Sequence, residues 1–336
     1  MPSFTKREFT RLNSSATILI LLPVALKNNS KYNTMTDNNN FDVIIIGGSY
    51  SGLAAAMALG RALKNVLIID DGKPCNRQTP HSHNFLTNDG KTPAEITVLA
   101  NLQVGRYDTV KFFNGTANSA NKTGSGFQVG LATGETFDAS KLVFATGIKD
   151  LLPAIDGLSE CWGISVIHCP YCHGYEVRNE QTGILGNGDM AFDFTKLISN
   201  WTNDLTLFTN GKSRLTADQT AKLESHQIEI IEKEIIKLEH INGHLLNVIF
   251  RDGSKSTAKA IYAPAPFEQH CKIPGALGCE LTEEGYIKID EFHETNIQGV
   301  FAIGDNASKM RTVANAVAMG TSAGITISKK MILEEF

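Results

Sequence analysis

A glycine-rich turn between an apolar run and a helix-like segment occurs twice, and this feature most constrains how the chain can fold. The first copy, "GGSYSG", follows the apolar run 41–46, and the next apolar run ends in Asp70-Asp71. The second copy, "GNGDMA", lies about 140 residues further on and precedes the run "DLTLFT". Strand, glycine turn, helix and strand in this order predict a βαβ unit. Two such units predict an α/β fold with two Rossmann-like nucleotide-binding domains.

Length, charge and cysteine content agree with this fold class. The 336 residues are enough for two domains with separate cores. A formal net charge of −4, without a basic block, argues against nucleic acid or an anionic membrane as a partner. Six cysteines are too few for a disulfide scaffold, and only Cys169 and Cys172 form a close pair. We expect an ordinary globular enzyme without a bound metal.

The first turn suits the pyrophosphate of a dinucleotide. Glycines let the phosphates approach the N-terminus of the following helix, where free N–H groups favour anions. Gly47 and Gly52 take the first and third positions of G-x-G-x-x-G, and Ser49, a small residue that keeps its N–H, takes the second. Asp70 follows Gly52 by 18 residues and suits the hydroxyls of a ribose. The alternative is a turn that only joins a strand to a helix.

The second turn, Gly186 to Ala191, is the G-x-G-x-x-A variant. The strand that follows it ends in "LFTNGKSRL", so no carboxylate stands at the ribose position. A missing carboxylate removes the repulsion of a 2′-phosphate and favours NADPH over NADH. The side chains available to such a phosphate are Thr209, Asn210, Lys212 and Arg214. A polar loop that contacts no ligand is the alternative.

The C-x-x-C pair in "HCPYCHGYEV", residues 168–177, fits a glutaredoxin, a c-type cytochrome, a zinc protein or a disulfide linked to a flavin. A glutaredoxin carries its pair early in a small domain, whereas a complete nucleotide-binding unit precedes Cys169. Haem attachment requires export and an axial ligand, and zinc ligands this contiguous do not easily close a tetrahedron. Two reduced structural cysteines are a further alternative. The position just ahead of a pyridine-nucleotide turn favours the flavin-linked disulfide.

From about residue 41 to residue 330 the chain resembles the low-molecular-weight thioredoxin reductase family. The matching stretches, in this order, are "DVIIIGGSYSGLAAA", "LVFATG", "HCPYCHGYEV", "ILGNGDMAFDF" and "GVFAIGD". The resemblance implies an FAD domain made of residues 41–151 and 271–336, with an NAD(P) domain inserted at residues 152–270. It also implies a homodimer, and a rotation of the inserted domain between the two half-reactions.

The resemblance implies roles for individual residues. Cys172 would face the flavin and Cys169 would attack the substrate. His173 would move the proton because an ordinary histidine titrates near neutrality, or it only bonds to the local backbone. For FAD, the expected contacts are Gly47, Gly48, Ser49, Gly52, Asp70, His83, Asn84, Gly147 and Gly304, with Asp305 on the ribityl chain and Thr312 and Val313 on the isoalloxazine. For NADPH they are Gly186, Gly188, Asp189, Ala191, Asn210, Lys212 and Arg214.

The chain also departs from typical thioredoxin reductases. These enzymes have Ala-Thr between the cysteines and an acid after the second one, where this chain has Pro170-Tyr171 and His173. Their arginine-rich signature in the inserted domain is missing too. We expect an enzyme that passes electrons from NADPH, or alternatively NADH, through FAD and the cysteine pair to a small redox protein such as thioredoxin or to a low-molecular-weight disulfide. The alternatives are a flavin-dependent dithiol oxidase that uses oxygen and a non-catalytic redox sensor.

The N-terminal residues differ in character from the rest. Lys6, Arg7 and Arg11 precede "SATILILLPVAL", an order that resembles a signal peptide. This run is about half of the ~20 residues that a membrane span needs, and Pro23 interrupts it. Met35 opens "MTDNNNFDVIIIGG", which is typical of the start of a cytosolic flavoprotein. We expect residues 1–40 to be a disordered or mis-assigned extension of a cytoplasmic protein, with a targeting segment as the alternative.

Overall fold

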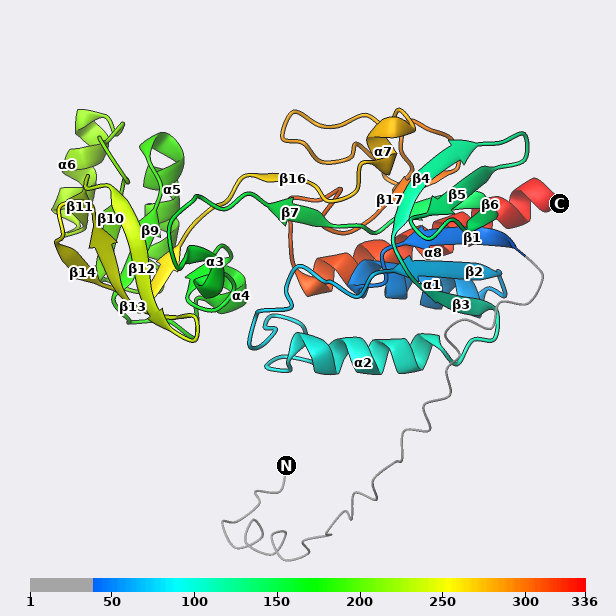
Figure 1. Ribbon diagram of the computed structural model, residues 1–336, viewed down its shortest axis with the longest axis horizontal. Coiled ribbons are helices and arrows are strands. Elements are labelled where there is room, and N and C mark those ends of the chain that lie inside the picture. Colours follow the sequence, from blue (N-terminus) through cyan, green and yellow to red (C-terminus); the bar gives the residue numbers. More distant parts are fainter. Residues whose placement is uncertain (1–38) are drawn as a thin grey trace, which may run out of the picture. The chain divides into compact units, whose positions relative to one another are not determined.

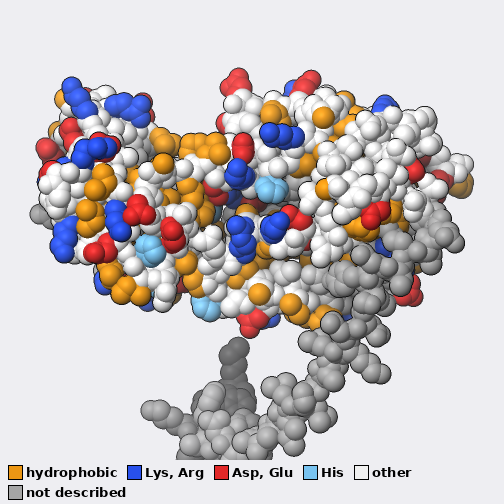
Figure 2. All heavy atoms as spheres, viewed as in Figure 1, with side chains coloured by type: hydrophobic (Ala, Val, Ile, Leu, Met, Phe, Trp, Pro, Cys, Tyr) orange, Lys and Arg blue, Asp and Glu red, His pale blue; other side chains and the backbone are white. Residues whose placement is uncertain are grey.

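The computed structural model describes residues 39–336, so the expected N-terminal extension lies almost wholly outside the described residues. The described residues form two α/β regions (Figure 1). We call residues 39–150 and 267–336 the outer region and residues 151–266 the inserted region. Within residues 39–336, no helix is long and apolar enough to cross a membrane. On the face shown in Figure 2, acidic and basic side chains are interspersed.

The outer region is built on a seven-stranded sheet with the order β3-β2-β1-β6-β5-β4, in which β17 also pairs with β6. Its strands are β1 (Asn40–Ile46), β2 (Val66–Asp70), β3 (Val110–Asn114), β4 (Ala117–Lys122), β5 (Phe127–Leu131), β6 (Thr136–Phe144) and β17 (Val300–Ala302). The strands β3, β2, β1, β6 and β17 are parallel, whereas β4, β5 and the start of β6 form an antiparallel meander. Because β17 comes from the C-terminal part of the chain, segments on both sides of the inserted region build this sheet.

Both faces of the parallel strands are buried, which explains why they are continuous apolar runs. One face packs on α1 (Tyr50–Arg61) and α8 (Val313–Glu335), and the region also holds α2 (Pro93–Val104) and α7 (Ile273–Ala276). The helices α1 and α8 approach closely where Gly320 has no side chain. A Cβ at Gly320 would lie only 2.1 Å from the carbonyl oxygen of Ser51. This packing fixes the N-terminus of α1, which follows the first glycine turn.

The inserted region repeats this plan on a smaller scale. Its parallel sheet has the order β11-β10-β9-β15-β8, and β12, β13 and β14 form an antiparallel sheet. The strands are β8 (Val166–Ile167), β9 (Thr182–Leu185), β10 (Leu205–Phe208), β11 (Glu229–Ile231), β12 (Ile235–Ile241), β13 (His244–Phe250), β14 (Lys255–Thr257) and β15 (Ala260–Tyr262). The helices are α3 (Leu158–Cys161), α4 (Pro170–His173), α5 (Gly188–Ile198) and α6 (Ala217–Ser225). The predicted α/β class with two Rossmann-like units is confirmed.

Two short antiparallel strands, β7 (Ile148–Asp150) and β16 (Phe267–Gln269), carry the chain into and out of the inserted region. They lie next to the domain boundaries expected at residues 151 and 270. In the outer region, the strands β1, β2, β6 and β17 all end toward one edge of the sheet. Ligands of open parallel sheets bind at such a carboxyl edge, so this edge positions the candidate site.

Candidate active site

The first glycine turn has a form that admits no side chain at its key positions. Gly47 has a φ of +105°, and a Cβ there would lie 2.2 Å from the carbonyl oxygen of Ala145. A Cβ at Gly52 would lie 1.9 Å from the carbonyl oxygen of Gly47. Ser49 is the N-cap residue of α1, yet its side chain makes no capping hydrogen bond. The N–H groups at the start of α1 are therefore left for an anionic ligand such as a pyrophosphate.

Asp70 closes this turn from the end of β2. Its carboxylate accepts hydrogen bonds from the N–H of Gly48 at 2.9 Å and of Gly72 at 3.1 Å. A Cβ at Gly48 would lie 2.9 Å from the Cβ of Asp70, so glycine is what leaves room for the acid. Each carboxylate oxygen can accept further hydrogen bonds, for example from the hydroxyls of a ribose. The glycine cradle and the carboxylate together fit the pyrophosphate and ribose of FAD.

A buried charge cluster lies where the outer-region sheet meets the strand β7. Arg311 pairs with Asp150 at 2.9 Å and lies 3.9 Å from Asp305. Burial raises the pKa of Asp305 to about 6, although the charge of Arg311 opposes the shift. A carboxyl group with a raised pKa at the end of a parallel strand suits hydrogen bonding to a ligand hydroxyl. The ribityl contact expected of Asp305 stays a prediction.

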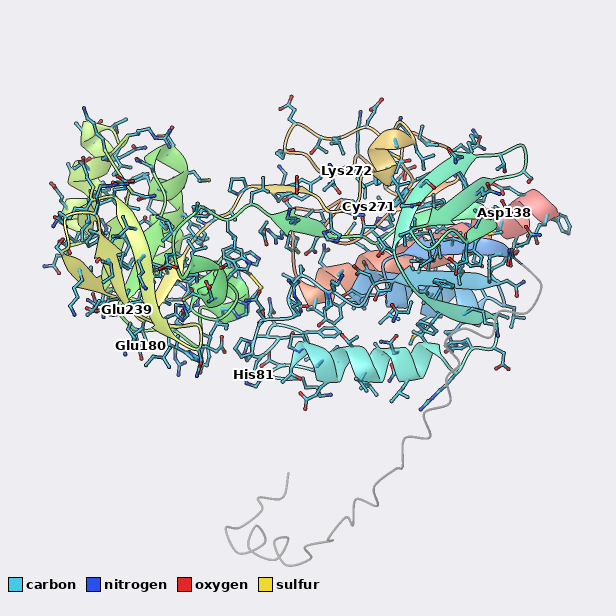
Figure 3. All side chains as sticks on the ribbon, in the orientation of Figure 1. His81, Asp138, Glu180, Glu239, Cys271 and Lys272 are labelled. Atoms are coloured by element: carbon cyan, nitrogen blue, oxygen red, sulfur yellow. A yellow bond between two sulfur atoms is a disulfide. The ribbon has the colours of Figure 1, made fainter. Side chains whose placement is uncertain are left out.

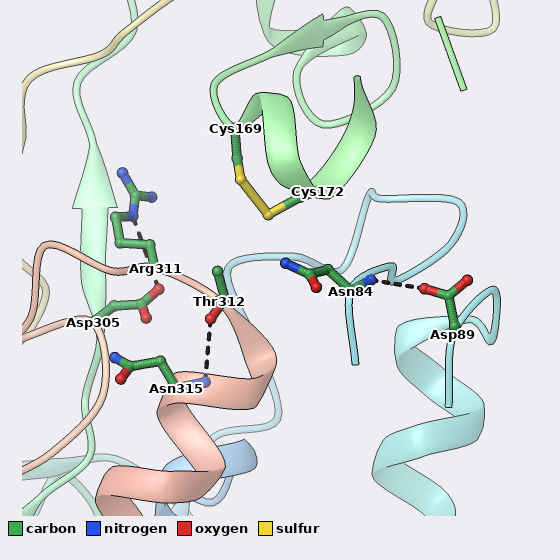
Figure 4. The surroundings of a disulfide bond; sticks show 8 residues. All are labelled: Asn84, Asp89, Cys169, Cys172, Asp305, Arg311, Thr312 and Asn315. Carbon is green, nitrogen blue, oxygen red and sulfur yellow. Dashed lines mark hydrogen bonds and ion pairs between the residues drawn. A yellow bond between two sulfur atoms is a disulfide. The ribbon is translucent and has the colours of Figure 1, made fainter. Parts of the chain in front are cut away.

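The other expected flavin residues of the outer region lie around the same edge. Gly147 and Gly304 have φ values of +62° and +81°, which shape the turns after β6 and β17. Thr312 caps α8, because its hydroxyl accepts the N–H of Asn315 at 3.1 Å, and Val313 is the first residue of that helix. Figure 4 shows Asn84 and Thr312 below the cysteine pair.

Cys169 and Cys172 form a disulfide with a Cα–Cα distance of 5.3 Å. Cys169 is the N-cap residue of the short helix α4, and Pro170 begins that helix, a position where its missing N–H costs nothing. Cys172 and His173 both donate their backbone N–H groups to the carbonyl oxygen of Cys169, which holds the turn closed. In Figure 4 Cys172 points toward Thr312 and Asn84 of the outer region. The disulfide thus faces the carboxyl edge of the outer-region sheet.

Two half-buried histidines flank the disulfide, and both are neutral near pH 7. Burial lowers the pKa of His173 to about 4, and the nearby His83 lowers it further. Burial also lowers the pKa of His168 to about 4, assisted by the charge of Arg311. The sequence predicted that His173 titrates near neutrality. That expectation is wrong, because the sequence does not show how far this side chain is withdrawn from water.

The second glycine turn is organised by a residue that the sequence interpretation did not select. The side chain of Asn187 donates to the carbonyl oxygens of Thr209 at 3.1 Å and of Lys212 at 3.0 Å. Its oxygen accepts the N–H of Arg214 at 2.7 Å. These bonds hold residues 209–214, which we call the 209–214 loop, against the turn. The central position of G-N-G was the only signal in the sequence for this role.

The expected NADPH contacts are not all free to bind a ligand. Asn210 has a φ of +50°, and its side-chain oxygen accepts the N–H of Ile235 at 2.8 Å, so this oxygen serves the fold. Asp189 accepts a hydrogen bond from Gln219 at 2.7 Å. Lys212 and Arg214 are exposed on the 209–214 loop. The remaining members, Gly186, Gly188 and Ala191, form the turn and the start of α5, with a φ of +71° at Gly188.

Several residues of the site had no recognisable pattern in the sequence. Arg311 and Asp150 are far apart along the chain, and only the fold brings them together. Glu176 and Asp89 flank His83 for the same reason. Within residues 39–336, no group of three or more His, Cys, Asp or Glu side chains is arranged to hold a metal ion.

A dinucleotide cradle, a second nucleotide turn and a disulfide that faces the first cradle define the class of pyridine nucleotide-dependent disulfide oxidoreductases. A family model described as "Pyridine nucleotide-disulphide oxidoreductase" matches residues 41–320. The chain belongs to this family. Its enzymes use a flavin together with a nicotinamide nucleotide, so this chain is an oxidoreductase and a flavoprotein.

Individual relatives place the chain more narrowly. It is 31% identical to thioredoxin reductase tcpT of Claviceps purpurea, over 89% of this chain and 97% of that protein. It is 32% identical to thioredoxin reductase sirT of Leptosphaeria maculans, over 84% of this chain and 92% of that protein. The structure of an oxidoreductase from Agrobacterium tumefaciens matches with a TM-score of 0.82 and 37% identity, over 88% of this chain and 99% of that one. The resemblance to thioredoxin reductases is confirmed.

Proposed function

We propose that the enzyme passes electrons from NADPH through FAD and the Cys169–Cys172 pair to a protein disulfide or a low-molecular-weight disulfide. The observation that carries this proposal is the orientation of the pair. Cys172 lies in the inserted region but points toward Thr312 and Asn84 of the outer region (Figure 4). A disulfide with only a structural role would have no reason to face the carboxyl edge of a nucleotide-binding sheet.

In this proposal the outer region holds FAD. Gly47, Gly52 and the start of α1 would receive the pyrophosphate, and Asp70 would receive a ribose. Asp305 would form a hydrogen bond to the ribityl chain, and Thr312 at the N-terminus of α8 would contact the ring system. When bound, the flavin supplies two-electron chemistry that amino-acid side chains lack.

The two cysteines then divide the exchange with the substrate. The Cys169 thiolate attacks one sulfur of the substrate disulfide, forming a mixed disulfide and releasing the other substrate sulfur as a thiolate. The Cys172 thiolate attacks Cys169, which restores the Cys169–Cys172 disulfide and releases the second substrate thiolate. Two electrons and two protons therefore pass to the substrate in each cycle.

His173 provides a neutral proton acceptor beside the pair. Its lowered pKa, about 4, means that the imidazole is unprotonated at neutral pH and is a weak base, so it would accept the thiol proton only in passing, on its way to the substrate thiolate. The low value also makes the resulting imidazolium a strong acid, which quickly returns the proton to the departing substrate thiolate. The role of His173 is thus transient proton storage and not stable protonation.

The inserted region supplies the nicotinamide nucleotide. Lys212 and Arg214 are exposed beside the second turn, and Thr209 stands where an acid would repel a 2′-phosphate. These features favour NADPH over NADH. The homodimer, the cytoplasmic location and thioredoxin as a partner stay predictions.

The test is NADPH oxidation with a low-molecular-weight aromatic disulfide, 5,5′-dithiobis(2-nitrobenzoate), or with thioredoxin. Cys169→Ser and Cys172→Ser should each lower turnover by about a hundredfold or more, because either change stops the exchange. Cys271→Ser is the matched control, since Cys271 is a free cysteine that packs against the outer-region core, and should turn over normally. Normal turnover in both serine variants would contradict the proposal. Reduction of the flavin by dithiols but not by NADPH would instead identify a dithiol oxidase.

A further inference from the structure

His83 occupies an unusual position between two carboxylates from different parts of the fold. Its Nδ1 lies 3.6 Å from Oδ2 of Asp89, and its Nε2 lies 3.6 Å from Oε1 of Glu176. The neutral imidazole has only one N–H, so it can serve one of these carboxylates but not both. The imidazolium has two. Each ring nitrogen of His83 faces a carboxylate oxygen.

The two carboxylates connect His83 to both regions. Asp89 belongs to the outer region and lies with His83 on residues 82–91, which we call the 82–91 loop. Glu176 belongs to the inserted region and follows Cys172 by four positions. The His83–Glu176 contact thus ties the segment that carries the disulfide to the outer region. A second link is the hydrogen bond from Gln78 to the carbonyl oxygen of Ser159, at 3.2 Å.

The 82–91 loop is built to hold His83 in place. Its ends are joined by the hydrogen bonds from Ser82 N–H to the Lys91 carbonyl and from Gly90 N–H to the Ser82 carbonyl. Asp89 also accepts the N–H of Asn84 at 2.7 Å, which fixes the carboxylate that faces Nδ1. Asn84 and Thr87 have φ values of +58° and +71°. Such conformations in non-glycine residues persist only where the surrounding structure maintains them.

We propose that His83 is a positioning residue, which holds the disulfide segment against the outer region through Glu176. This inference rests on the proposed function, because it assigns a purpose to the closed arrangement. Asp89 lies beside Nδ1 of His83, Glu176 lies beside its Nε2, and the ring of His81 lies 6.3 Å away.

Loss of the His83 imidazole would remove the contact with Glu176. The disulfide segment would then be held less firmly, and the cysteines would become more accessible to reagents in solution.

The test measures the alkylation of Cys172 in the FAD-bound protein after reduction with a phosphine. Iodoacetamide labelling is followed by mass spectrometry, and each variant is compared with the wild type at the same pH. His83→Gln should label about threefold to tenfold faster than the wild type, the effect of losing one partly screened contact with Glu176. His83→Arg, which can donate to both carboxylates, should label about as slowly as the wild type.

The controls separate the link from simple damage to the loop. His81, labelled in Figure 3, directly precedes the 82–91 loop and bonds to the carbonyl oxygen of Gly90, but Asp89 and Glu176 pair with His83 and not with His81, so His81→Gln should behave as the wild type. Glu176→Gln should reproduce His83→Gln, and the double variant should be no faster than either one. Equal labelling of His83→Gln and the wild type, or fast labelling of His83→Arg, would overturn the inference. Because a chemical reductant is used, a failure of NADPH-driven turnover would leave this result unaffected.

Discussion

The two glycine turns share one backbone plan but use the space beside it in opposite ways. At the first turn Gly48 has no side chain, and the carboxylate of Asp70 fills the space and accepts the N–H of Gly48. At the second turn the equivalent residue is Asn187, whose own side chain fills the space and bonds to the 209–214 loop. One turn therefore offers a fixed negative group to a ribose. The other offers a neutral turn flanked by the exposed cations Lys212 and Arg214.

The third position of each turn differs as well. Gly52 lies so close to Gly47 that no Cβ can be added, whereas Ala191 already carries a Cβ and is fully buried. The first turn is the tighter one, and it has less tolerance for change. Two sites with a shared motif can therefore differ in their ligand and in their sensitivity to mutation.

The largest effect is expected at the third motif position of the two turns, where Gly52 is changed to alanine and Ala191 to glycine. Gly52→Ala would place a Cβ 1.9 Å from the Gly47 carbonyl oxygen, so the turn must open. We expect the FAD content to fall to near zero and the free energy of unfolding to fall by about 3 kcal/mol. Ala191→Gly should cost about 1 kcal/mol, the ordinary price of glycine in a helix, and leave FAD bound. Flavin absorbance and denaturant unfolding measure both. Equal losses of FAD and of stability in the two variants would show that the two turns do not differ in their tolerance for change.

The next effect concerns the carboxylate itself. Asp70→Asn removes the charge that accepts two backbone N–H groups and leaves a single amide oxygen. We expect FAD to bind about tenfold to hundredfold more weakly, since a hydrogen bond to a charged group contributes about 1.5–3 kcal/mol. The measurement is a titration of the deflavinated protein with FAD. Asp71→Asn is the control, because Asp71 pairs only with the exposed Lys73 at 3.4 Å, and unchanged binding in both variants would refute this role.

A smaller effect should distinguish the nucleotide of the second turn. The double variant Lys212→Ala, Arg214→Ala removes the two exposed cations, so the KM for NADPH should rise about tenfold while kcat and the KM for NADH stay unchanged. Lys222→Ala on α6 removes an exposed cation elsewhere in the inserted region and serves as the control. Steady-state kinetics with both nucleotides measure the change. An equal rise for NADH would show that the loop does not recognise a 2′-phosphate.

The smallest effect is an opposite response of the two regions to acid. His173 has a lowered pKa of about 4, so the stability from its neutral form is present above about pH 6.5 and is lost as the pH falls toward 4. Asp305 has a raised pKa of about 6, so its burial is less costly as the pH falls from about 6 toward 4. His173→Gln should reduce the loss of unfolding free energy between pH 7 and pH 5 by on the order of 1 kcal/mol, and Asp305→Asn should increase that loss. Denaturant unfolding at pH 7 and pH 5 tests both signs.

The sequence predicted the parts of the fold and site that depend on local patterns. The turns at Gly47 and Gly186 were predictable because glycine spacing and β-branched runs are short-range signals. The cysteine pair was recognisable because its spacing and its position ahead of a nucleotide turn are both local features.

The rest depends on tertiary packing that no short pattern records. The Arg311–Asp150 pair joins residues on either side of the inserted region, and the His83–Glu176 contact joins the two regions. Asn210 was expected among the contacts of a 2′-phosphate, and the backbone turn at φ +50° directs its side-chain oxygen to Ile235, which no sequence pattern indicated. The lowered pKa of His173 arises from burial, which follows from the fold and not from the residue type.

The most direct measurement is an anaerobic titration of the purified protein with NADPH, with the flavin absorbance as the readout. The wild type should take up about two equivalents before the flavin is fully bleached, because both the flavin and the disulfide accept an electron pair. Cys172→Ser should need about one. If the wild type and this variant bleach at the same equivalence point, the cysteine pair exchanges no electrons with the flavin, and the account of this site is wrong.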